Sequence, residues 1–254
     1  MTDPIFDVSD RVVLVAGGAR GLGLELAKGL AQRGARIVLA DSLTEEAAEA
    51  VSQLEGSGHF STSLDVTDEQ SVEDVFQLIR SRAGRLDSLL NSAGIARFAP
   101  AVEMSSEDFV QTMAVNVTGA FYLSRCAARV MMAQDGGGQI VHLASVSSRV
   151  VNETYAAYSP SKAALAQLVR ILAMEWARKG ITVNAIGPAV IRTPMTETTL
   201  LADPETRAYA LAQIPMGRFG EPGDLLGSAL LLMSPAGRFI TGQTIYVDGG
   251  RTLK

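Results

Sequence analysis

The chain has 254 residues, of which 47% are hydrophobic and 19% charged, a composition that allows a large buried core and argues against disorder. The formal net charge at pH 7 is −5, and no block of lysine or arginine is present that would attract a nucleic acid. No run approaches the roughly 18 apolar residues of a membrane span. We therefore predict a mildly acidic globular protein without a nucleic-acid or membrane partner.

Cysteine and histidine are scarce in this chain. Cys126 is the only cysteine, which excludes an intrachain disulfide, and its apolar helical surroundings indicate a small buried hydrophobe. His59 and His142 are far apart in the sequence, so we predict no metal site. The first residues carry acids where a signal peptide needs a basic region. With a reduced cysteine, this predicts a cytoplasmic protein.

A cluster of glycines stands between the first predicted strand and the first predicted helix. Residues 11–16 form a short β-branched run typical of a strand buried on both faces, and residues 24–32 are apolar at helical spacing. In that context the glycines let backbone approach a pyrophosphate at the helix N-terminus, whereas without it the cluster would be only a loop. The predicted cofactor-binding residues here are Gly17, Arg20, Gly21, Leu22 and Gly23.

A second predicted strand, residues 35–40, ends on Asp41. A carboxylate about 20 residues past such glycines accepts hydrogen bonds from the adenosine ribose hydroxyls. Its charge would repel a 2′-phosphate, so Asp41 predicts NAD rather than NADP. Arg20 favours the opposite choice, because a guanidinium binds phosphate. The alternative is that Asp41 only caps the helix expected from Thr44.

Two further predicted strands, residues 59–64 and 87–90, also end in polar or small residues. The carboxyl ends of parallel strands border the ligand crevice of an open sheet. An acid there can accept from the adenine amino group, and small residues let a ligand pass close by. The predicted cofactor-binding residues at these ends are Asp65, Val66, Asn91, Ala93 and Gly94.

Ser145 ends the strand predicted over residues 139–144, and Tyr158 and Lys162 follow it on a predicted helix. Positions i and i+4 share one helix face, so the phenol and the ammonium should point the same way. A neighbouring ammonium lowers the pKa of a phenol from its usual value of about 10. Such a tyrosine exchanges a proton with an alcohol or a carbonyl.

Asn116 lies inside an apolar stretch that we predict to be one long helix, residues 107–132. A buried amide needs partners, because an unpaired one costs several kcal/mol. Two interpretations follow: the side chain locks a kink in its helix, or it holds a water for proton relay.

Strands alternate with helices along the whole chain, and the last two strands are expected at residues 181–186 and 244–247. This pattern predicts an α/β fold with one doubly wound parallel sheet of about seven strands and helices on both faces. We expect a single domain over residues 1–254. Residues 189–216 mix Thr, Met, Leu and Pro, and we predict that they form a mobile lid over the substrate.

Taken together, these motifs resemble the short-chain dehydrogenase/reductase family over essentially the whole chain. Each motif alone has little specificity, but the set occurs in the expected order and at the expected element ends. The matching positions are Gly17, Gly21, Gly23, Asp65-Val66, Asn91 to Gly94, Asn116, Ser145, Tyr158, Lys162, Gly187-Pro188 to Thr193, and Asp248 to Gly250.

The resemblance implies a Rossmann-like fold and a role for each matching residue. Tyr158 would be the general acid/base, with Lys162 lowering its pKa and binding the nicotinamide ribose. Ser145 would stabilise charge on the substrate oxygen, and Asn116 would complete a proton relay through water. Pro188, Ile191 and Thr193 would lie at the nicotinamide carboxamide. The resemblance also implies a homotetramer.

The predicted function is NAD-dependent interconversion of a secondary alcohol and a ketone, with a polyol, sugar or sugar acid as substrate. One alternative is a 3-oxoacyl-thioester reductase that uses NADPH. Another is a dinucleotide-binding sensor or scaffold that has lost catalysis. Four polar residues either contact the substrate or are solvated loop residues: Arg97, Arg149, Asn152 and Glu153.

Overall fold

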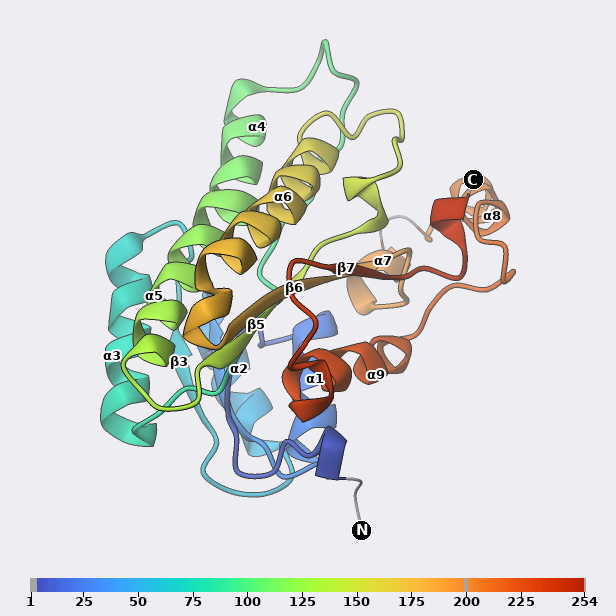
Figure 1. Ribbon diagram of the computed structural model, residues 1–254. Coiled ribbons are helices and arrows are strands. Elements are labelled where there is room, and N and C mark those ends of the chain that lie inside the picture. The colour runs from blue at the N-terminus through green and yellow to red at the C-terminus, as the bar shows by residue number, and fades with distance from the viewer. Residues whose placement is uncertain (1–3, 199–200, 254) are drawn as a thin grey trace.

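A seven-stranded parallel sheet forms the centre of the computed structural model, which describes residues 4–198 and 201–253 (Figure 1). The strand order is β3-β2-β1-β4-β5-β6-β7, and every neighbouring pair is parallel. The order reverses direction between β1 and β4, the place where doubly wound sheets bind their ligands. The predicted fold class is confirmed. The strands are β1 (Val12–Ala16), β2 (Arg36–Asp41), β3 (Phe60–Ser63), β4 (Ser88–Asn91), β5 (Gly138–Leu143), β6 (Ile181–Pro188) and β7 (Thr244–Val247).

The sheet is buried on both faces, which explains why its central strands read as continuous apolar runs. All five residues of β1 are buried. Val12 and Leu14 pack into one hydrophobic core, whereas Val13 and Val15 pack into the other. Successive side chains of a strand point to opposite faces, so each residue of such a strand must be apolar.

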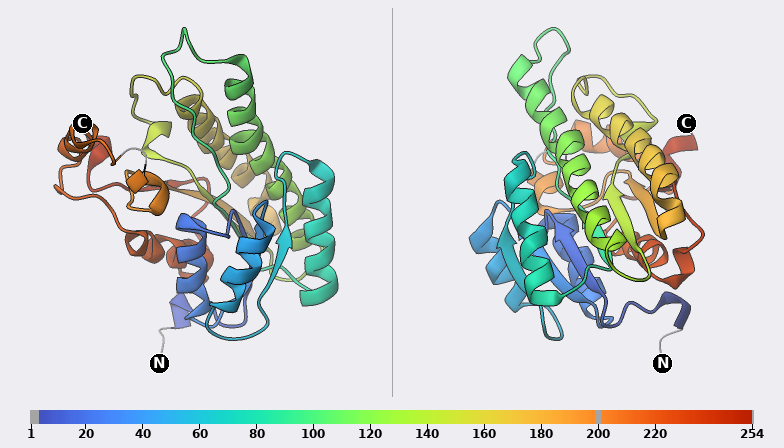
Figure 2. Two further views of the ribbon diagram at one scale, coloured as in Figure 1. Left: turned by 180° about the vertical axis from the view of Figure 1, so that it is seen from behind. Right: turned by 60° about the vertical axis from the view of Figure 1, so that its left-hand side comes forward.

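Two layers of helices cover the sheet, and Figure 2 shows them from two sides. One core contains buried residues of α1, α2 and α9, and the other contains buried residues of α3, α5 and α6. No helix within the described residues is long and apolar enough to cross a membrane. The helices are α1 (Gly21–Ala31), α2 (Thr44–Ser52), α3 (Glu69–Ala83), α4 (Ser106–Met113), α5 (Ala120–Met132), α6 (Tyr158–Trp176), α7 (Pro194–Thr198), α8 (Pro204–Ala212) and α9 (Pro222–Met233).

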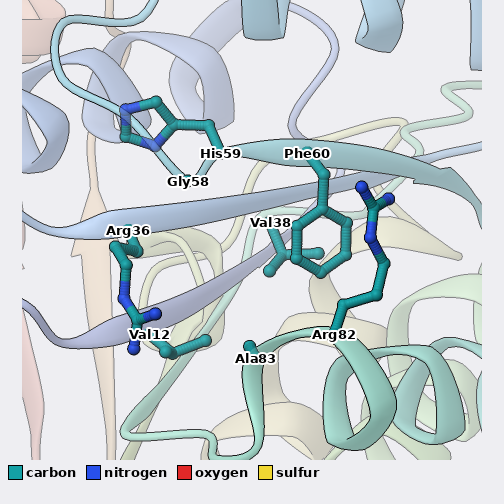
Figure 3. A pocket seen from close by; sticks show the side chains of 8 residues that line it. All are labelled: Val12, Arg36, Val38, Gly58, His59, Phe60, Arg82 and Ala83. Atoms are coloured by element: carbon teal, nitrogen blue, oxygen red, sulfur yellow. The ribbon is translucent and has the colours of Figure 1, made fainter.

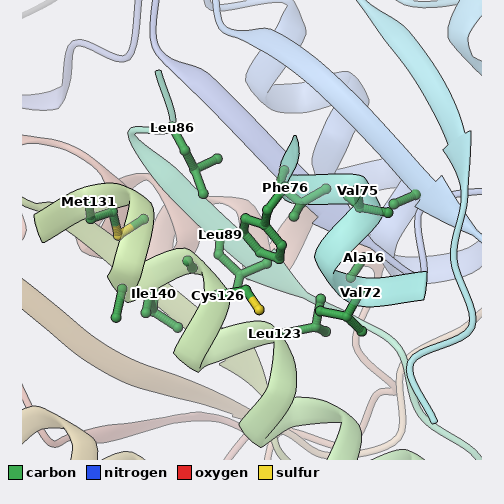
Figure 4. Packing of buried hydrophobic residues seen from close by; sticks show 14 of the residues in the cluster. Ala16, Val72, Val75, Phe76, Leu86, Leu89, Leu123, Cys126, Met131 and Ile140 are labelled. Carbon is green, nitrogen blue, oxygen red and sulfur yellow. The ribbon is translucent and has the colours of Figure 1, made fainter. Parts of the chain in front are cut away.

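The core between α3, α5 and the sheet includes the single cysteine (Figure 4). Cys126 is 4% exposed and packs with Phe76, Leu89 and Leu123. Burial raises the pKa of its thiol, which keeps it protonated. The prediction of a small buried hydrophobe is confirmed.

Two helix boundaries differ from the sequence expectation. The first helix begins at Gly21 rather than at residue 24, so two of the motif glycines lie in its first turn. The long helix expected over residues 107–132 is wrong as one α-helix, because a π-helical segment, Ala114–Gly119, separates α4 from α5. Asn116 lies in this segment. π-Helical turns inside helices are frequent at functional sites.

The segment expected to form a lid contains the short helices α7 and α8, and its residues 199–200 lie outside the described part of the chain. The chain then returns through α9 to β7 at the sheet edge. A final 3-10 turn, η6 (Arg251–Leu253), follows β7 near the C-terminus (Figure 1). Other short 3-10 turns are η1 (Pro4–Phe6), η3 (Val146–Ser148), η4 (Ala177–Lys179) and η5 (Pro235–Gly237).

Candidate active site

The turn after β1 requires glycine at two positions. Gly17 has φ +74°, and a Cβ there would lie 2.6 Å from the backbone nitrogen of Ala93. A Cβ on Gly23 would lie 2.1 Å from the carbonyl oxygen of Gly17. No side chain fits at either distance, so these glycines let α1 begin directly against the turn and against the loop that follows β4.

The N-terminus of α1 is open. Its N-cap residue, Arg20, makes no side-chain capping hydrogen bond. Nothing lies within 4 Å of the Cβ position of Gly21, while Leu22 packs against the core. The first backbone N–H groups of a helix are unpaired and carry positive partial charge. These residues therefore fit the pyrophosphate of a dinucleotide, as the sequence predicts.

Asp41 is fixed beside this turn by two backbone hydrogen bonds. Its Oδ2 accepts from the N–H of Ala19 at 3.0 Å, and its Oδ1 accepts from the N–H of Leu43 at 3.1 Å. The N-cap of α2 is Leu43, so the alternative that Asp41 caps this helix is wrong. Arg20 is exposed and forms no ion pair within the described residues. A carboxylate and a guanidinium therefore both stand at the predicted ribose position.

Asp65 and Val66 follow β3 at the same edge of the sheet. Asp65 is exposed, and its Oδ1 accepts from the N–H of Thr67 at 2.8 Å and from its hydroxyl at 2.7 Å. Val66 is 8% exposed and packs against Gly119, where a Cβ would lie 2.8 Å from the valine. This contact joins the end of β3 to the π-helical segment.

Asn91 belongs to a buried chain of hydrogen bonds that sequence analysis missed. Its Oδ1 accepts from the N–H of Ala93 at 3.1 Å, and its Nδ2 is 3.1 Å from Nδ1 of His142. Nε2 of His142 is 2.9 Å from Oγ of Ser124, which donates its proton to the carbonyl of Ala120. Since the Ser124 proton is used, Nε2 of His142 donates and Nδ1 accepts. Burial lowers the pKa of His142 to about 3, so the ring is neutral.

Asn116 uses its side-chain amide entirely within the protein. Its Oδ1 accepts from the N–H of Ile95, and its Nδ2 donates to the Ile95 carbonyl and to Oγ of Ser161, each at 2.9 Å. A Cβ on Gly94 would lie 3.2 Å from this Oδ1 and 3.4 Å from Nζ of Lys162. The amide therefore ties the π-helical segment to the loop after β4 and to α6, with both N–H groups of Nδ2 used in hydrogen bonds.

Ser145, Tyr158 and Lys162 come together where β5 ends and α6 begins. Ser145 is 8% exposed, and its Oγ accepts from the N–H of Ser147 at 3.1 Å. Tyr158 is the first residue of α6, and Lys162 stands one turn later with Nζ 5.7 Å from the centre of the Tyr158 ring. Nζ donates a hydrogen bond to the carbonyl of Leu143 at 2.8 Å. The predicted shared face is confirmed.

The net shift in the pKa of Tyr158 is opposite in direction to the one expected from Lys162. Burial raises the pKa of the Tyr158 phenol, and the Ser145 hydroxyl opposes that rise only in part. Burial also lowers the pKa of Lys162 to about 8. Desolvation disfavours the charged form of both groups. The phenol is therefore protonated at neutral pH and is a proton donor.

Pro188, Ile191 and Thr193 follow the sheet edge after β6. Pro188 is paired with Val247 in the sheet. The hydroxyl of Thr196 donates to the carbonyl of Ile191 at 2.8 Å and accepts from the N–H of Thr193 at 2.8 Å. A ligand amide that bound these two residues would therefore compete with Thr196.

An aromatic cluster, formed by Phe98, Tyr155 and Tyr158, is a second feature that sequence analysis missed. The ring centres of Phe98 and Tyr155 are 4.4 Å apart, and both rings lie within 6.0 Å of Tyr158. Two loops far apart in sequence meet here through the hydrogen bond from Ala99 N–H to the Thr154 carbonyl. No periodic pattern marks such loop residues.

The four polar residues considered for substrate contact differ in their surroundings. Arg97 forms an ion pair with Asp108 of α4, with Nε 3.3 Å from Oδ1. Arg149 and Glu153 are exposed. Asn152 accepts a hydrogen bond from Arg251, a residue that sequence analysis did not single out.

Two cavities lie at opposite ends of the sheet. One, of about 230 Å³, is lined by Ile191, Ile214, Met216 and Val247 among others, and lies under the predicted lid. The other, of about 220 Å³, is lined by Arg36, Phe60 and Arg82 among others (Figure 3). It contains none of the predicted site residues and lies where β2 and β3 begin. Only the first cavity adjoins the site.

This arrangement, with a glycine turn and a Ser–Tyr–Lys set on one edge of a doubly wound sheet, is that of a nicotinamide-dependent oxidoreductase. Comparison with known proteins agrees. The family model described as enoyl-(acyl carrier protein) reductase matches residues 17–252. The gluconate 5-dehydrogenase of Gluconobacter oxydans is 39% identical over 251 residues, which cover 98% of this chain and 97% of that protein. The chain belongs to the short-chain dehydrogenase/reductase family.

Two further similar proteins bear on the cofactor. The NAD-dependent glycerol dehydrogenase of Listeria innocua is 36% identical over 252 residues, which cover 99% of this chain and 98% of that protein. The crystal structure of a gluconate 5-dehydrogenase from Burkholderia cenocepacia in complex with NADP and tartrate has a TM-score of 0.94 and 35% identity, and the match covers 99% of this chain and 98% of that one. Similar proteins thus include one named as NAD-dependent and one crystallised with NADP.

Proposed function

We propose that this protein is an NAD-dependent oxidoreductase that interconverts a secondary alcohol and a ketone, with a polyol, sugar or sugar acid as substrate. The observation that carries the proposal is the position of Gly94. This glycine of the predicted cofactor wall lies against Asn116 and Nζ of Lys162, and its loop is joined to the glycine turn through Ala93. The predicted cofactor and proton-transfer residues therefore share one sheet edge.

In the proposed mechanism, a bound nicotinamide supplies or accepts the hydride. For ketone reduction, the protonated phenol of Tyr158 donates its proton to the substrate oxygen, and the Ser145 hydroxyl binds the same oxygen as negative charge develops there. Lys162, buried beside the ring, stabilises the phenolate that remains. In alcohol oxidation the same phenolate takes the proton back. Asn116 keeps α6 and the Gly94 loop in register for this transfer.

Asp41 supports the choice of NAD, because a carboxylate at the ribose repels a 2′-phosphate. Arg20 and the NADP in the Burkholderia structure favour the other choice. The deciding experiment is titration of NADH and NADPH into the wild type, Asp41→Asn and Arg20→Gln. We expect wild type to bind NADH at least about 10-fold more tightly. Asp41→Asn should remove most of that difference, while Arg20→Gln should weaken NADPH only. A wild-type preference for NADPH would contradict the cofactor proposal.

The substrate proposal is tested by following NADH absorbance with polyols, sugar acids and an acetoacetyl thioester. The 3-oxoacyl-[acyl-carrier-protein] reductase of Escherichia coli, 36% identical to this chain, favours the thioester alternative, whereas the gluconate and glycerol dehydrogenases favour the polyol and sugar-acid class. Turnover of the thioester alone would support the reductase. A protein that binds NADH but turns over none of these compounds would support the sensor.

We also propose that the chain is a single domain that forms a cytoplasmic homotetramer, with residues 189–216 as a lid. All four residues of the edge strand β7 are half-buried, and on α6 Met174 is 84% exposed and Ile171 is 49% exposed. Exposed apolar helix faces and an unpaired strand edge are features that partner subunits cover. Light scattering measures the assembly, and a monomer at micromolar concentration would contradict it.

A further inference from the structure

The C-terminal turn η6 reaches back to the loop that precedes the catalytic tyrosine. Nη2 of Arg251 donates a hydrogen bond to Oδ1 of Asn152 at 3.3 Å, although 99 residues separate the two in sequence. The guanidinium also lies near the phenol of Tyr155, whose pKa burial raises and the arginine charge lowers. Arg251 therefore stands at the side of the loop that carries Tyr155.

Tyr155 connects this arginine to the reactive phenol. Its ring centre is 6.0 Å from that of Tyr158 and 4.4 Å from that of Phe98, which is 51% exposed. The three rings form a cluster in which each ring lies near the other two, and the Arg251 charge acts on Tyr155. Aromatic faces suit the C–H groups of a carbon chain that carries hydroxyls along its other side.

Arg251 has no counter-charge within the described residues. The nearby carboxylate of Asp248 binds backbone instead. It accepts hydrogen bonds from the N–H groups of Gly250 at 2.9 Å and Thr252 at 2.8 Å. Arg251 forms no ion pair in the described part of the chain, and it is only partly exposed. A guanidinium whose single polar contact in the described part of the chain is a neutral amide keeps most of its donors for a planar anion such as a carboxylate.

We propose that Arg251 binds the carboxylate of the substrate, so that the substrate is a sugar acid rather than a neutral polyol. This inference rests on the proposed function and narrows it. The guanidinium contacts Asn152 and acts on Tyr155, whereas within the described residues no interaction joins it to Tyr158, so we place the carboxylate several carbons away from the carbon that is oxidised. The substrate class is therefore a hydroxy acid of aldonate length, oxidised at a carbinol remote from its acid group.

The experiment compares D-gluconate with D-glucitol, which share a six-carbon polyhydroxy chain and differ in the carboxylate. Each is titrated by calorimetry into the full-length protein saturated with reduced dinucleotide, so that no turnover occurs. Wild type is expected to bind gluconate at least about 10-fold more tightly, and Arg251→Gln to weaken gluconate about 10- to 100-fold, the loss typical of a charge-assisted hydrogen bond. Binding of glucitol should change less than about 3-fold.

Two further variants distinguish binding of the carboxylate by Arg251 from support of the loop that contains Asn152. Asn152→Ala removes the hydrogen bond but keeps the charge, so it should preserve the preference for gluconate. Arg238→Gln, at a guanidinium whose hydrogen bond among the described residues goes to the Pro235 carbonyl, should change neither affinity. Equal affinity of wild type for the two compounds, or the same loss in Asn152→Ala as in Arg251→Gln, would overturn the inference.

Turnover assays distinguish failure of this inference from failure of the proposed function. A protein that oxidises glucitol as well as gluconate would retain the proposed function and overturn the role of Arg251. A protein that oxidises neither but binds gluconate through Arg251 would support the carboxylate site and contradict the proposed reaction.

Discussion

Asn91 and His142 face each other across β4 and β5, with Nδ2 of the asparagine 3.1 Å from Nδ1 of the histidine. The histidine is fully buried, and its other nitrogen is bound to Ser124. The side-chain oxygen of Asn91 in turn accepts a hydrogen bond from the N–H of Ala93. A neutral histidine in the centre of the sheet therefore supports the loop that carries the predicted cofactor residues Ala93 and Gly94.

His142 should make the protein sensitive to acid. Its folded-state pKa of about 3 lies below the ordinary value of 6.5, so between these values the unfolded chain binds a proton that the native state does not. Stability is then complete above pH 6.5 and falls as the pH drops, by at most about 1.4 kcal/mol per pH unit. Urea unfolding of wild type and His142→Asn from pH 7.5 to 4.5 measures this. The free energy of unfolding should fall more steeply with decreasing pH in wild type than in His142→Asn. Parallel curves would refute the lowered pKa of His142.

Lys162 should cost the ligand-free protein stability at neutral pH. Its pKa falls from 10.5 to about 8 on folding, so the buried charge destabilises the native state below pH 8. The cost disappears as the pH rises from 8 to 10.5, because only the native lysine loses its proton there. Lys162→Met should therefore be inactive yet more stable at pH 7, by about 1–3 kcal/mol.

The advantage of Lys162→Met should shrink at pH 9.5. Urea unfolding without cofactor at the two pH values measures it, with the exposed Lys179 changed to Met as the control. The free energy of unfolding of this control should differ from that of wild type by less than about 0.5 kcal/mol at both pH values. An advantage that grows with pH would show that folding raises the pKa of Lys162 instead of lowering it.

Tyr158→Phe should lower kcat by about 10²–10⁴-fold, because the phenyl ring cannot transfer a proton. Cofactor affinity, measured by NADH fluorescence, should stay within about 3-fold of wild type. Since the pKa of the phenol is raised, wild-type alcohol oxidation should accelerate with pH from 7 to 10, while ketone reduction should not. Tyr122→Phe, on α5, is the matched control. Retained turnover in Tyr158→Phe would exclude it as the acid/base.

Much of the fold follows from local sequence. Consecutive apolar residues in β1 are required because its two sides enter different cores, and strand ends such as Asp41 and Asn91 share one edge because the strands are parallel. Such features repeat along the chain and need no knowledge of distant partners. The glycine turn and the pairing of Tyr158 with Lys162 on one helix face were predictable for the same reason.

What could not be predicted depends on contacts between distant residues. The π-helical segment around Asn116 coincides with bonds to Ile95 and Ser161, which lie 21 and 45 residues away. The depressed pKa of Lys162 and the raised pKa of Tyr158 arise from burial, which the i, i+4 spacing does not report. The approach of Arg251 to the catalytic loop likewise depends on the whole C-terminal path.

Two glycine-to-alanine substitutions should have opposite effects because of what surrounds each glycine. In α1, a Cβ at Gly23 would lie 2.1 Å from the carbonyl oxygen of Gly17, a backbone atom that cannot move without opening the turn. Gly227, inside α9, has nothing within 4 Å of its Cβ position. Gly23→Ala should abolish dinucleotide binding and destabilise the protein by about 2–3 kcal/mol. Gly227→Ala should stabilise it by about 0.5–1 kcal/mol, since alanine favours the helix.

Urea unfolding and NADH fluorescence measure both effects on the same two proteins. Gly227→Ala should keep wild-type cofactor affinity, because α9 contributes no residue to the glycine turn. If Gly23→Ala still bound NADH normally, α1 could not start against Gly17 in solution as it does in this structure. The pyrophosphate would then have to bind elsewhere, and the N-terminus of α1 would lose its assigned role.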